Sequence, residues 1–305
     1  MGILNHTSDG LYNMVAVLYR TVVRLEPMSA DALVSLCTAG IETGKSGQPR
    51  MRDALMRWNA LGLFETDSAG LVHLAPGCEP GAAAGDDQAL TQALRRAVLR
   101  IAFRAANVGE DLWSTEGSAD LARGLAWWMA QDTWTVDTSV AALLSLESDQ
   151  AARPDLRIVN NDVRMARLRE WALFLGFAWS HGRGMELDPT QAIACVLADV
   201  LPRADEEVAA TDFLLALARA LPVLDQGQWR VEVEAQLRTD VWHATPPGWV
   251  SSTLARALRR MDHSGRLRLV SRADAGTAVR IPGRGGTSAR PWSVFTHVVR
   301  TEGAR

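Results

Sequence analysis

Residues 50–76 read RMRDALMRWNALGLFETDSAGLVHLAP, in which a helix is followed by a hairpin. Apolar residues recur at helical spacing on one face of the first half: Met51, Leu55, Trp58 and Leu61. Gly62 is a typical residue for ending such a helix. Asp67-Ser68-Ala69-Gly70 then separates two short apolar runs, which predicts a hairpin turn.

Two further helices are expected before this one. Residues 11–25 are apolar at helical spacing and follow a Ser8/Asp9 cap, and Ser29 begins a shorter helix. The order helix, helix, turn, helix, hairpin is that of a winged-helix domain, which residues 11–76 resemble.

The pattern of amphipathic helix, glycine and hairpin recurs twice along the chain. Its other copies are RLREWALFLGFAWSHGRGMELDP at 167–189 and LARALRRMDHSGRLRLVSRADAGTAVRIP at 254–282, the latter with Ala273–Gly276 at the turn. Residues 240–282 therefore resemble a second winged-helix domain, and 158–189 resemble one less closely. The uneven spacing argues against a solenoid. The expected fold class is mainly α, with two or three winged-helix units, each a helical bundle with a small β-hairpin wing.

The middle segment carries its own helix-end signals. Asn160-Asn161-Asp162 can cap a helix at its start, and Gly176 can end it. The chain then turns at His181-Gly182-Arg183-Gly184, between two short runs that predict a hairpin.

A low-complexity stretch, GCEPGAAAGDD at 77–87, indicates a domain boundary. The expected domains are an N-terminal winged helix at 1–78, a linker at 79–87, a helical domain with a candidate second winged helix at 88–200, and a C-terminal helical region with a basic winged helix at 201–305.

Composition narrows the functional class. The 305 residues are 48% hydrophobic and 22% charged, with no apolar run of membrane-spanning length and no basic-then-apolar leader. We therefore expect a cytoplasmic protein without a membrane partner. Three separated cysteines and six histidines without helical i, i+4 pairing predict no metal site, cofactor or disulfide framework.

Charge is distributed unevenly along the chain. Residues 249–305 contain eleven arginines and three acidic residues, a net +8, so the remainder carries −11 within a total of −3. A basic segment of this kind predicts an anionic partner, double-stranded DNA in particular. A GC-rich genome would explain why Lys45 is the only lysine. It would not explain why the arginines cluster.

The run AGIETGKSG at 39–47 fits a loose phosphate-binding P-loop, which would make the protein an ATPase. A P-loop needs a buried strand before it and a helix after it. The residues before Ala39 have helical spacing instead, and Pro49 is expected to interrupt a following helix. We find no apolar strand ending in an acid that could hold Mg²⁺ and no strained nucleophile elbow. An ATPase is thus a remote alternative, and a non-enzymatic protein without catalytic residues is expected.

In winged-helix proteins the third helix enters the DNA major groove, and the hairpin contacts the neighbouring backbone. The resemblance implies DNA contacts on the third helices, the preceding loop and the wing: Lys45, Ser46, Gln48, Arg50, Arg52, Arg57, Arg256, Arg259, Arg260 and Arg272. Arginine supplies affinity through phosphates and readout through guanine. A solvated turn at 45–48 and a solvated charged helix face remain the alternatives.

The opening LNHTSDGLYNMVAVLYRTV at 4–22, the length and the scattered helix-hairpin units also resemble DpdG-type accessory proteins of bacterial DNA-modification and anti-phage loci. That resemblance implies a defence-system subunit without chemistry of its own. The rival interpretation is a scaffold that binds other protein subunits, favoured by the acidic residues 1–248 and by an apolar outward face around Phe174. Most of the eleven tryptophans are expected in the core, although aromatic rings can also stack on single-stranded bases.

Overall fold

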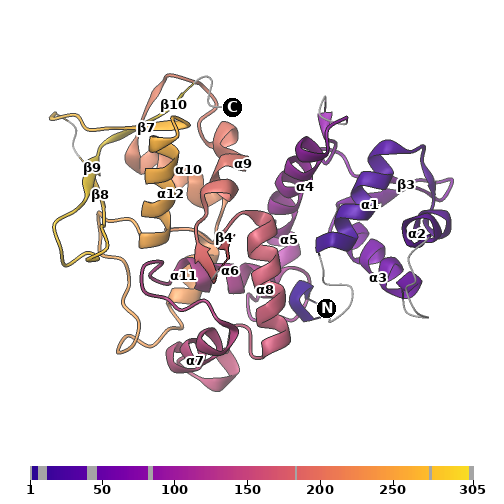
Figure 1. The fold of residues 1–305 in the computed structure, drawn as a ribbon, viewed down its shortest axis with the longest axis horizontal. Coiled ribbons are helices and arrows are strands. Elements are labelled where there is room, and N and C mark those ends of the chain that lie inside the picture. Colours follow the sequence, from indigo (N-terminus) through magenta and orange to yellow (C-terminus); the bar gives the residue numbers. More distant parts are fainter. Residues whose placement is uncertain are drawn as a thin grey trace. The chain divides into compact units, whose positions relative to one another are not determined.

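The computed structural model describes residues 2–5, 12–39, 47–81, 85–182, 184–274 and 277–301. Within them the chain is mainly helical with small antiparallel sheets, which confirms the expected fold class in its broad form (Figure 1). Two compact units are present, Met1–Glu110 with Ser114–Ala119 and Asp111–Trp113 with Asp120–Arg305. None of the described helices is both long and apolar enough to cross a membrane.

The first unit contains a three-helix, three-strand module. Its elements in chain order are α1 (Tyr12–Arg24), β1 (Met28–Ser29), α2 (Ala30–Thr38), α3 (Gly47–Ala60), β2 (Phe64–Thr66) and β3 (Leu71–Leu74). The three strands form one antiparallel sheet in the order β1-β3-β2. The short strand β1 places the chain before α2 beside the hairpin, so the sheet closes one end of the three-helix bundle.

The hairpin turn forms at the expected residues. The carboxylate of Asp67 accepts hydrogen bonds from the backbone nitrogens of Ala69 and Leu71, both at 2.9 Å. Gly70 has φ 80°, a left-handed conformation that glycine adopts without strain. The bond from Leu71 and the bond from His73 hold the pKa of Asp67 below its usual value.

A 3₁₀ turn, η1 (Ile3–Asn5), and two helices, α4 (Asp87–Ala102) and α5 (Ala105–Val108), complete the first unit. α4 is joined to α1, since Arg24 pairs with Asp87 at 2.5 Å and Arg20 donates to Thr91 at 2.9 Å. Residues 79–87, expected as a linker between domains, therefore connect two parts of one compact unit.

Helix α2 precedes the candidate P-loop, so the expectation of a helix in place of a buried strand is confirmed. The expectation that Pro49 interrupts the next helix is wrong, because α3 begins at Gly47 and includes Pro49 in its first turn. Proline is tolerated there because the first backbone N–H groups of a helix lack intrahelical partners in any case. Lys45 and Ser46 lie outside the described residues, as do Ser8 and Asp9.

The second unit begins with helices and one hairpin. Its elements are α6 (Ala119–Met129), α7 (Val140–Gln150), the 3₁₀ turn η3 (Pro154–Leu156), α8 (Asp162–Leu175), β4 (Ala178–His181) and β5 (Gly184–Leu187). The side chain of Asn161 caps α8 by accepting from Arg164 N at 2.9 Å, and Gly176 ends it with φ 85°. The hairpin pairs His181 with Gly184, as expected.

The expectation that Phe174 belongs to an outward apolar face is wrong, because its side chain is buried. α8 contacts α7 and β4, and only Asp162 and Val163 of its residues are exposed. Phe174 is buried and meets Trp171 edge to face at 5.8 Å between ring centroids. The expected core role of tryptophan is confirmed for Trp58 and Trp171, both fully buried.

The rest of the second unit repeats the module of the first. Its elements are α9 (Thr190–Val200), β6 (Glu207–Ala209), α10 (Ala210–Ala220), α11 (Gln228–Glu234), α12 (Ser252–His263), β7 (Leu267–Val270), β8 (Val279–Ile281), β9 (Ser293–Phe295) and β10 (His297–Arg300). α9, β6, α10, α12, β7 and β10 follow the order of α1 to β3, and the sheet order β6-β10-β7 matches β1-β3-β2. α11 is inserted before α12, and the β8–β9 hairpin is inserted between β7 and β10.

The hairpin expected within residues 254–282 is wrong in its pairing. β7 pairs with β10, and β8 pairs with β9. The reason lies in burial, because Val298 and Val299 of β10 are fully buried between β6 and β7, whereas Val279 and Ile281 of β8 are buried against β9. Of the expected turn, Ala275 and Gly276 lie outside the described residues.

Candidate functional site

Helix α3 presents an open polar face in the first unit. Its inner face buries Met51, Ala54, Leu55 and Trp58, and the exposed positions include Gln48, Arg50 and Arg52. Arg52 pairs with Asp31 of α2 at 2.5 Å and remains accessible. Asp53 is also exposed, and Arg57 is half-buried. Three of the predicted contact residues therefore lie on the surface of the helix that follows the Lys45–Ser46 segment.

Acidic residues of the same chain engage the polar face of the equivalent helix of the second unit, α12. Arg256 pairs with Glu186 of β5, and Arg260 pairs with Asp188 directly after β5. Asp188 is buried, so its charge is compensated by Arg260 and by the backbone and hydroxyl of Thr190. Two of the arginines expected to face DNA are thus held by acidic residues of the same chain.

The connection between α6 and α7 anchors α12 further. Thr133 donates through Oγ1 to the carbonyl of Leu187 at 2.7 Å, and Arg256 donates to the same hydroxyl at 3.2 Å. Thr253 donates to the carbonyl of Met129 at 2.8 Å. These bonds make the polar face of α12 part of an internal interface with the β4–β5 hairpin and the α6–α7 connection.

The two remaining predicted arginines have different surroundings. The guanidinium of Arg259 lies 3.4 Å from the ring centroid of Trp292, whose side chain is exposed. Arg272 pairs with Glu207 of β6 at 2.5 Å. This pairing raises the pKa of Arg272 and lowers the pKa of Glu207. Arg272 is therefore tied to its own sheet, whereas Arg259 contacts an aromatic ring and makes no ion pair among the described residues.

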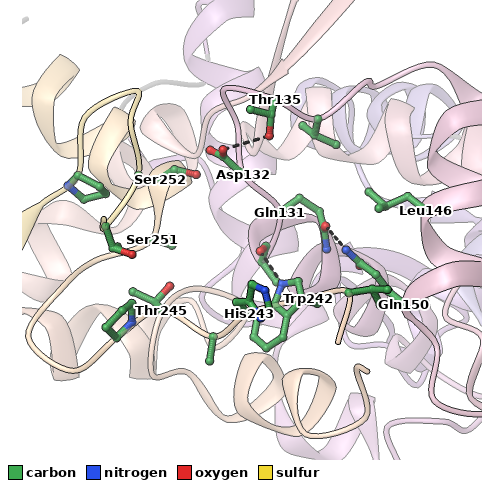
Figure 2. A pocket seen from close by; sticks show the side chains of 18 of the residues that line it. Gln131, Asp132, Thr135, Leu146, Gln150, Trp242, His243, Thr245, Ser251 and Ser252 are labelled. Atoms are coloured by element: carbon green, nitrogen blue, oxygen red, sulfur yellow. Dashed lines mark hydrogen bonds between the residues drawn. The ribbon is translucent and has the colours of Figure 1, made fainter. Parts of the chain in front are cut away.

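A cavity of about 550 Å³ opens at the start of α12 (Figure 2). Its walls come from the end of α6 and the α6–α7 connection, from α7, from residues 241–252 and from residues 282–287. The polar side chains that line it are those of Gln131, Asp132, Thr135, Asp137, Gln150, His243, Thr245, Ser251, Ser252 and Thr287. No sequence motif marks this cavity, because its residues come from distant segments of the chain.

Several polar groups of the cavity wall already have partners. Gln150 donates to Gln131 at 2.9 Å, and the amides lie close together in Figure 2. Thr135 donates to Asp132 at 3.0 Å. Ser251 is the N-cap of α12 and donates to Asp225 at 2.6 Å, which fixes it in a structural role. In the described part of the chain, no group of three or more His, Cys, Asp or Glu residues is placed to hold a metal ion.

Comparison with known proteins identifies the family. No curated protein and no solved structure matches the chain. A family model described as DpdG-like matches residues 1–275, well over half of the sequence. This match agrees with the resemblance of the opening segment, and the chain belongs to the DpdG-like family.

Proposed function

We propose that this protein is a non-enzymatic, double-stranded DNA-binding accessory subunit of a bacterial DNA-modification or anti-phage system. Membership of the DpdG-like family supports an accessory role in DNA-modification loci. The two modules supply the proposed means of binding, since we interpret both as winged-helix domains.

The repeated topology carries this proposal. Each module runs helix, strand, helix, helix, strand, strand, and each sheet places the last strand in the middle. This is the arrangement of a winged-helix domain, in which the third helix corresponds to the recognition helix of a helix-turn-helix protein. α3 and α12 occupy that position.

We assign the duplex contact to the first module. Gln48, Arg50 and Arg52 of α3 are exposed, and of the two arginines only Arg52 is ion-paired among the described residues, whereas Arg256 and Arg260 of α12 are both held by carboxylates. Lys45 and Ser46 directly precede α3 in the sequence, and the amino end of a helix attracts anions. These residues are proposed to contact phosphates, with the α3 side chains reaching base edges.

Anisotropy of a labelled DNA duplex over a salt series tests the assignment. The Arg50→Ala/Arg52→Ala variant removes two proposed base contacts, each worth about 1–3 kcal/mol, so it should bind the duplex about tenfold more weakly or worse. Lys45→Ala removes a proposed phosphate contact and should decrease the slope of log K against log salt by about 1. Arg24→Ala is a matched control for Arg52→Ala. Both arginines form 2.5 Å ion pairs, and their side chains are 45% and 46% exposed.

The proposal requires Arg52→Ala to weaken duplex binding and Arg24→Ala to leave it unchanged. Equal effects of the two variants, or binding that does not depend on salt, would contradict it. ATP binding that disappears in Lys45→Ala would revive the ATPase alternative.

A protein-interaction scaffold is the second candidate. The observation that favours it is the engagement of α12, whose arginines pair with Glu186 and Asp188 and are not free for phosphates. The net negative charge of residues 1–248 also favours a scaffold. Co-purification with a protein encoded nearby, together with no affinity for duplex DNA, would select this function.

A further inference from the structure

The second module carries a much longer wing than the first. β2 and β3 are joined by residues 67–70, whereas β7 and β10 are separated by residues 271–296, which contain the β8–β9 hairpin. We call residues 271–296 the extended wing; Figure 1 shows its β8–β9 hairpin at the edge of the ribbon beside α12. Nothing in the basic topology of the module requires this insertion.

The extended wing and its neighbours hold most of the uncompensated positive charge of the C-terminal segment. Arg256, Arg260 and Arg272 pair with acidic residues. Among the described residues, the following arginines of this segment make no ion pair: Arg259, Arg266, Arg268, Arg280, Arg284, Arg290 and Arg300. Arg300 instead donates to the carbonyls of Leu201 and Pro202. A guanidinium without a carboxylate keeps its N–H donors available for a phosphate.

Three of these arginines lie over tryptophan rings. The distances from guanidinium carbon to ring centroid are 3.4 Å for Arg259 on Trp292, 5.5 Å for Arg284 on Trp134 and 6.0 Å for Arg280 on Trp249. Trp292 is half exposed although it is a large apolar residue. Trp134 and Trp249 are partly buried, so Trp292 is the exposed ring of this group and lies among several cations of the extended wing and α12.

We propose that the extended wing and Arg259 form a binding surface for single-stranded nucleic acid. Single strands present both phosphates and unstacked base faces, and proteins bind them by combining basic side chains with aromatic rings. A duplex would use the arginines but hides its base faces, so it would leave the exposed ring of Trp292 unused. This surface lies on the second unit and stands independently of the duplex contact proposed for α3.

The chain contains a matched control for the central aromatic residue. Trp179 of β4 is 52% exposed and Trp292 is 51% exposed. Each lies beneath an arginine, Arg260 at 5.6 Å and Arg259 at 3.4 Å. The difference is that Arg260 is held by Asp188. The two tryptophans are thus equally exposed as residues, and only the Trp292 pair offers an arginine without an ion pair among the described residues.

The experiment measures anisotropy of a fluorescein-labelled oligothymidine with the full chain, over a salt series. Trp292→Ala should weaken binding at least fivefold, since stacking of one base on an aromatic ring is worth about fivefold or more. Arg284→Ala should weaken binding and reduce its salt dependence. Trp179→Ala should bind as the unsubstituted protein does, and circular dichroism checks that each variant is folded.

Each outcome decides the matter. The single-strand proposal would be overturned if Trp292→Ala and Trp179→Ala bound oligothymidine with equal affinity, or if the protein did not bind oligothymidine. It would also be overturned if polyglutamate competed as strongly as unlabelled oligothymidine. The Arg50→Ala/Arg52→Ala variant should lose duplex binding and retain oligothymidine binding. Duplex binding by this variant tests the contact proposed for α3, and oligothymidine binding tests the extended wing, so the two proposals can fail independently.

Discussion

Replacing Arg260 with alanine tests whether the polar face of α12 is an internal interface. The guanidinium of Arg260 is 47% exposed, but its partner carboxylate on Asp188 is only 2% exposed. Removal of the arginine leaves that carboxylate buried with Thr190 as its remaining hydrogen-bond partner. The variant should therefore be less stable, because the buried carboxylate of Asp188 is left without its counterion.

The size of the expected stability loss follows from the exposed fractions of the Arg260 and Asp188 side chains. Breaking a buried ion pair by removing one partner costs about 3–5 kcal/mol. Because Arg260 is half exposed, water can replace part of its interaction, and we expect about 2–3 kcal/mol. Arg259→Ala is the matched control on the same helix. It removes an exposed cation–π contact and no ion pair, so about 0.5–1 kcal/mol is expected.

Urea unfolding followed by circular dichroism measures the difference. With a slope of about 2–3 kcal/mol per molar urea, Arg260→Ala should lower the midpoint by about 1 M. Adding Asp188→Asn to Arg260→Ala should restore part of the stability, because asparagine can still accept from Thr190 without a buried charge. The interface interpretation is refuted if Arg260→Ala and Arg259→Ala are equally stable, or if Asp188→Asn gives no rescue.

Three further predictions concern the stability of the second unit. Asp225→Ala should lower the free energy of unfolding by about 3 kcal/mol in urea titrations, because it removes a counterion of the buried Arg230; a loss as small as that of a surface variant would contradict this. Gly176→Ala should cost about 2 kcal/mol or more, since φ is 85° and the new Cβ would lie 2.8 Å from a backbone nitrogen of α9; an unchanged melting temperature would show that the turn relaxes. Arg272 lowers the pKa of Glu207 in the folded state. The pair therefore stabilises the folded protein at pH values above the pKa of unfolded glutamate, about 4.3, and this stabilisation is lost as the pH falls through the lower pKa of folded Glu207. Thermal unfolding from pH 3 to 7 should therefore show Glu207→Gln less stable than the unsubstituted protein only at the higher pH.

The features that sequence predicted correctly depend on contacts within a few residues. The Asp67 turn is closed by hydrogen bonds to residues two and four positions along the chain. The Asn161 cap reaches three residues ahead, and Gly176 ends α8 through its own backbone conformation. Such signals are complete within the local sequence, so the patterns that encode them can be recognised directly.

The features that sequence missed depend on distant partners. β6 pairs with β10 through Val208 and Val298, and neither strand exceeds four residues. The apolar run at β8 was expected to pair with β7, but β8 pairs with β9 and β7 pairs with β10. Short strands carry too little periodicity to identify their partners.

The candidate site shows the same limit for charged residues. The outward face of α12 was correctly placed opposite its apolar face, but its surroundings could not be inferred. Glu186 and Asp188 lie 70 and 72 residues before Arg256 and Arg260 in the chain. Periodicity predicts which side of a helix is polar; it does not show whether solvent, DNA or another part of the chain covers that side.

The structure consequently changes what the basic C-terminal segment implies. Its net +8 was attributed to residues facing a single anionic partner, yet three of its arginines neutralise Glu186, Asp188 and Glu207 of the preceding acidic sequence. Part of the charge asymmetry is therefore an internal complementarity between two segments of one folded unit. Among the described residues of the segment, the arginines without ion pairs include Arg280, Arg284 and Arg290 of the extended wing, together with Arg259, Arg266, Arg268 and Arg300. An anionic ligand of this unit should thus be sought at the extended wing and Arg259, and not at the α12 arginines that pair with Glu186 and Asp188.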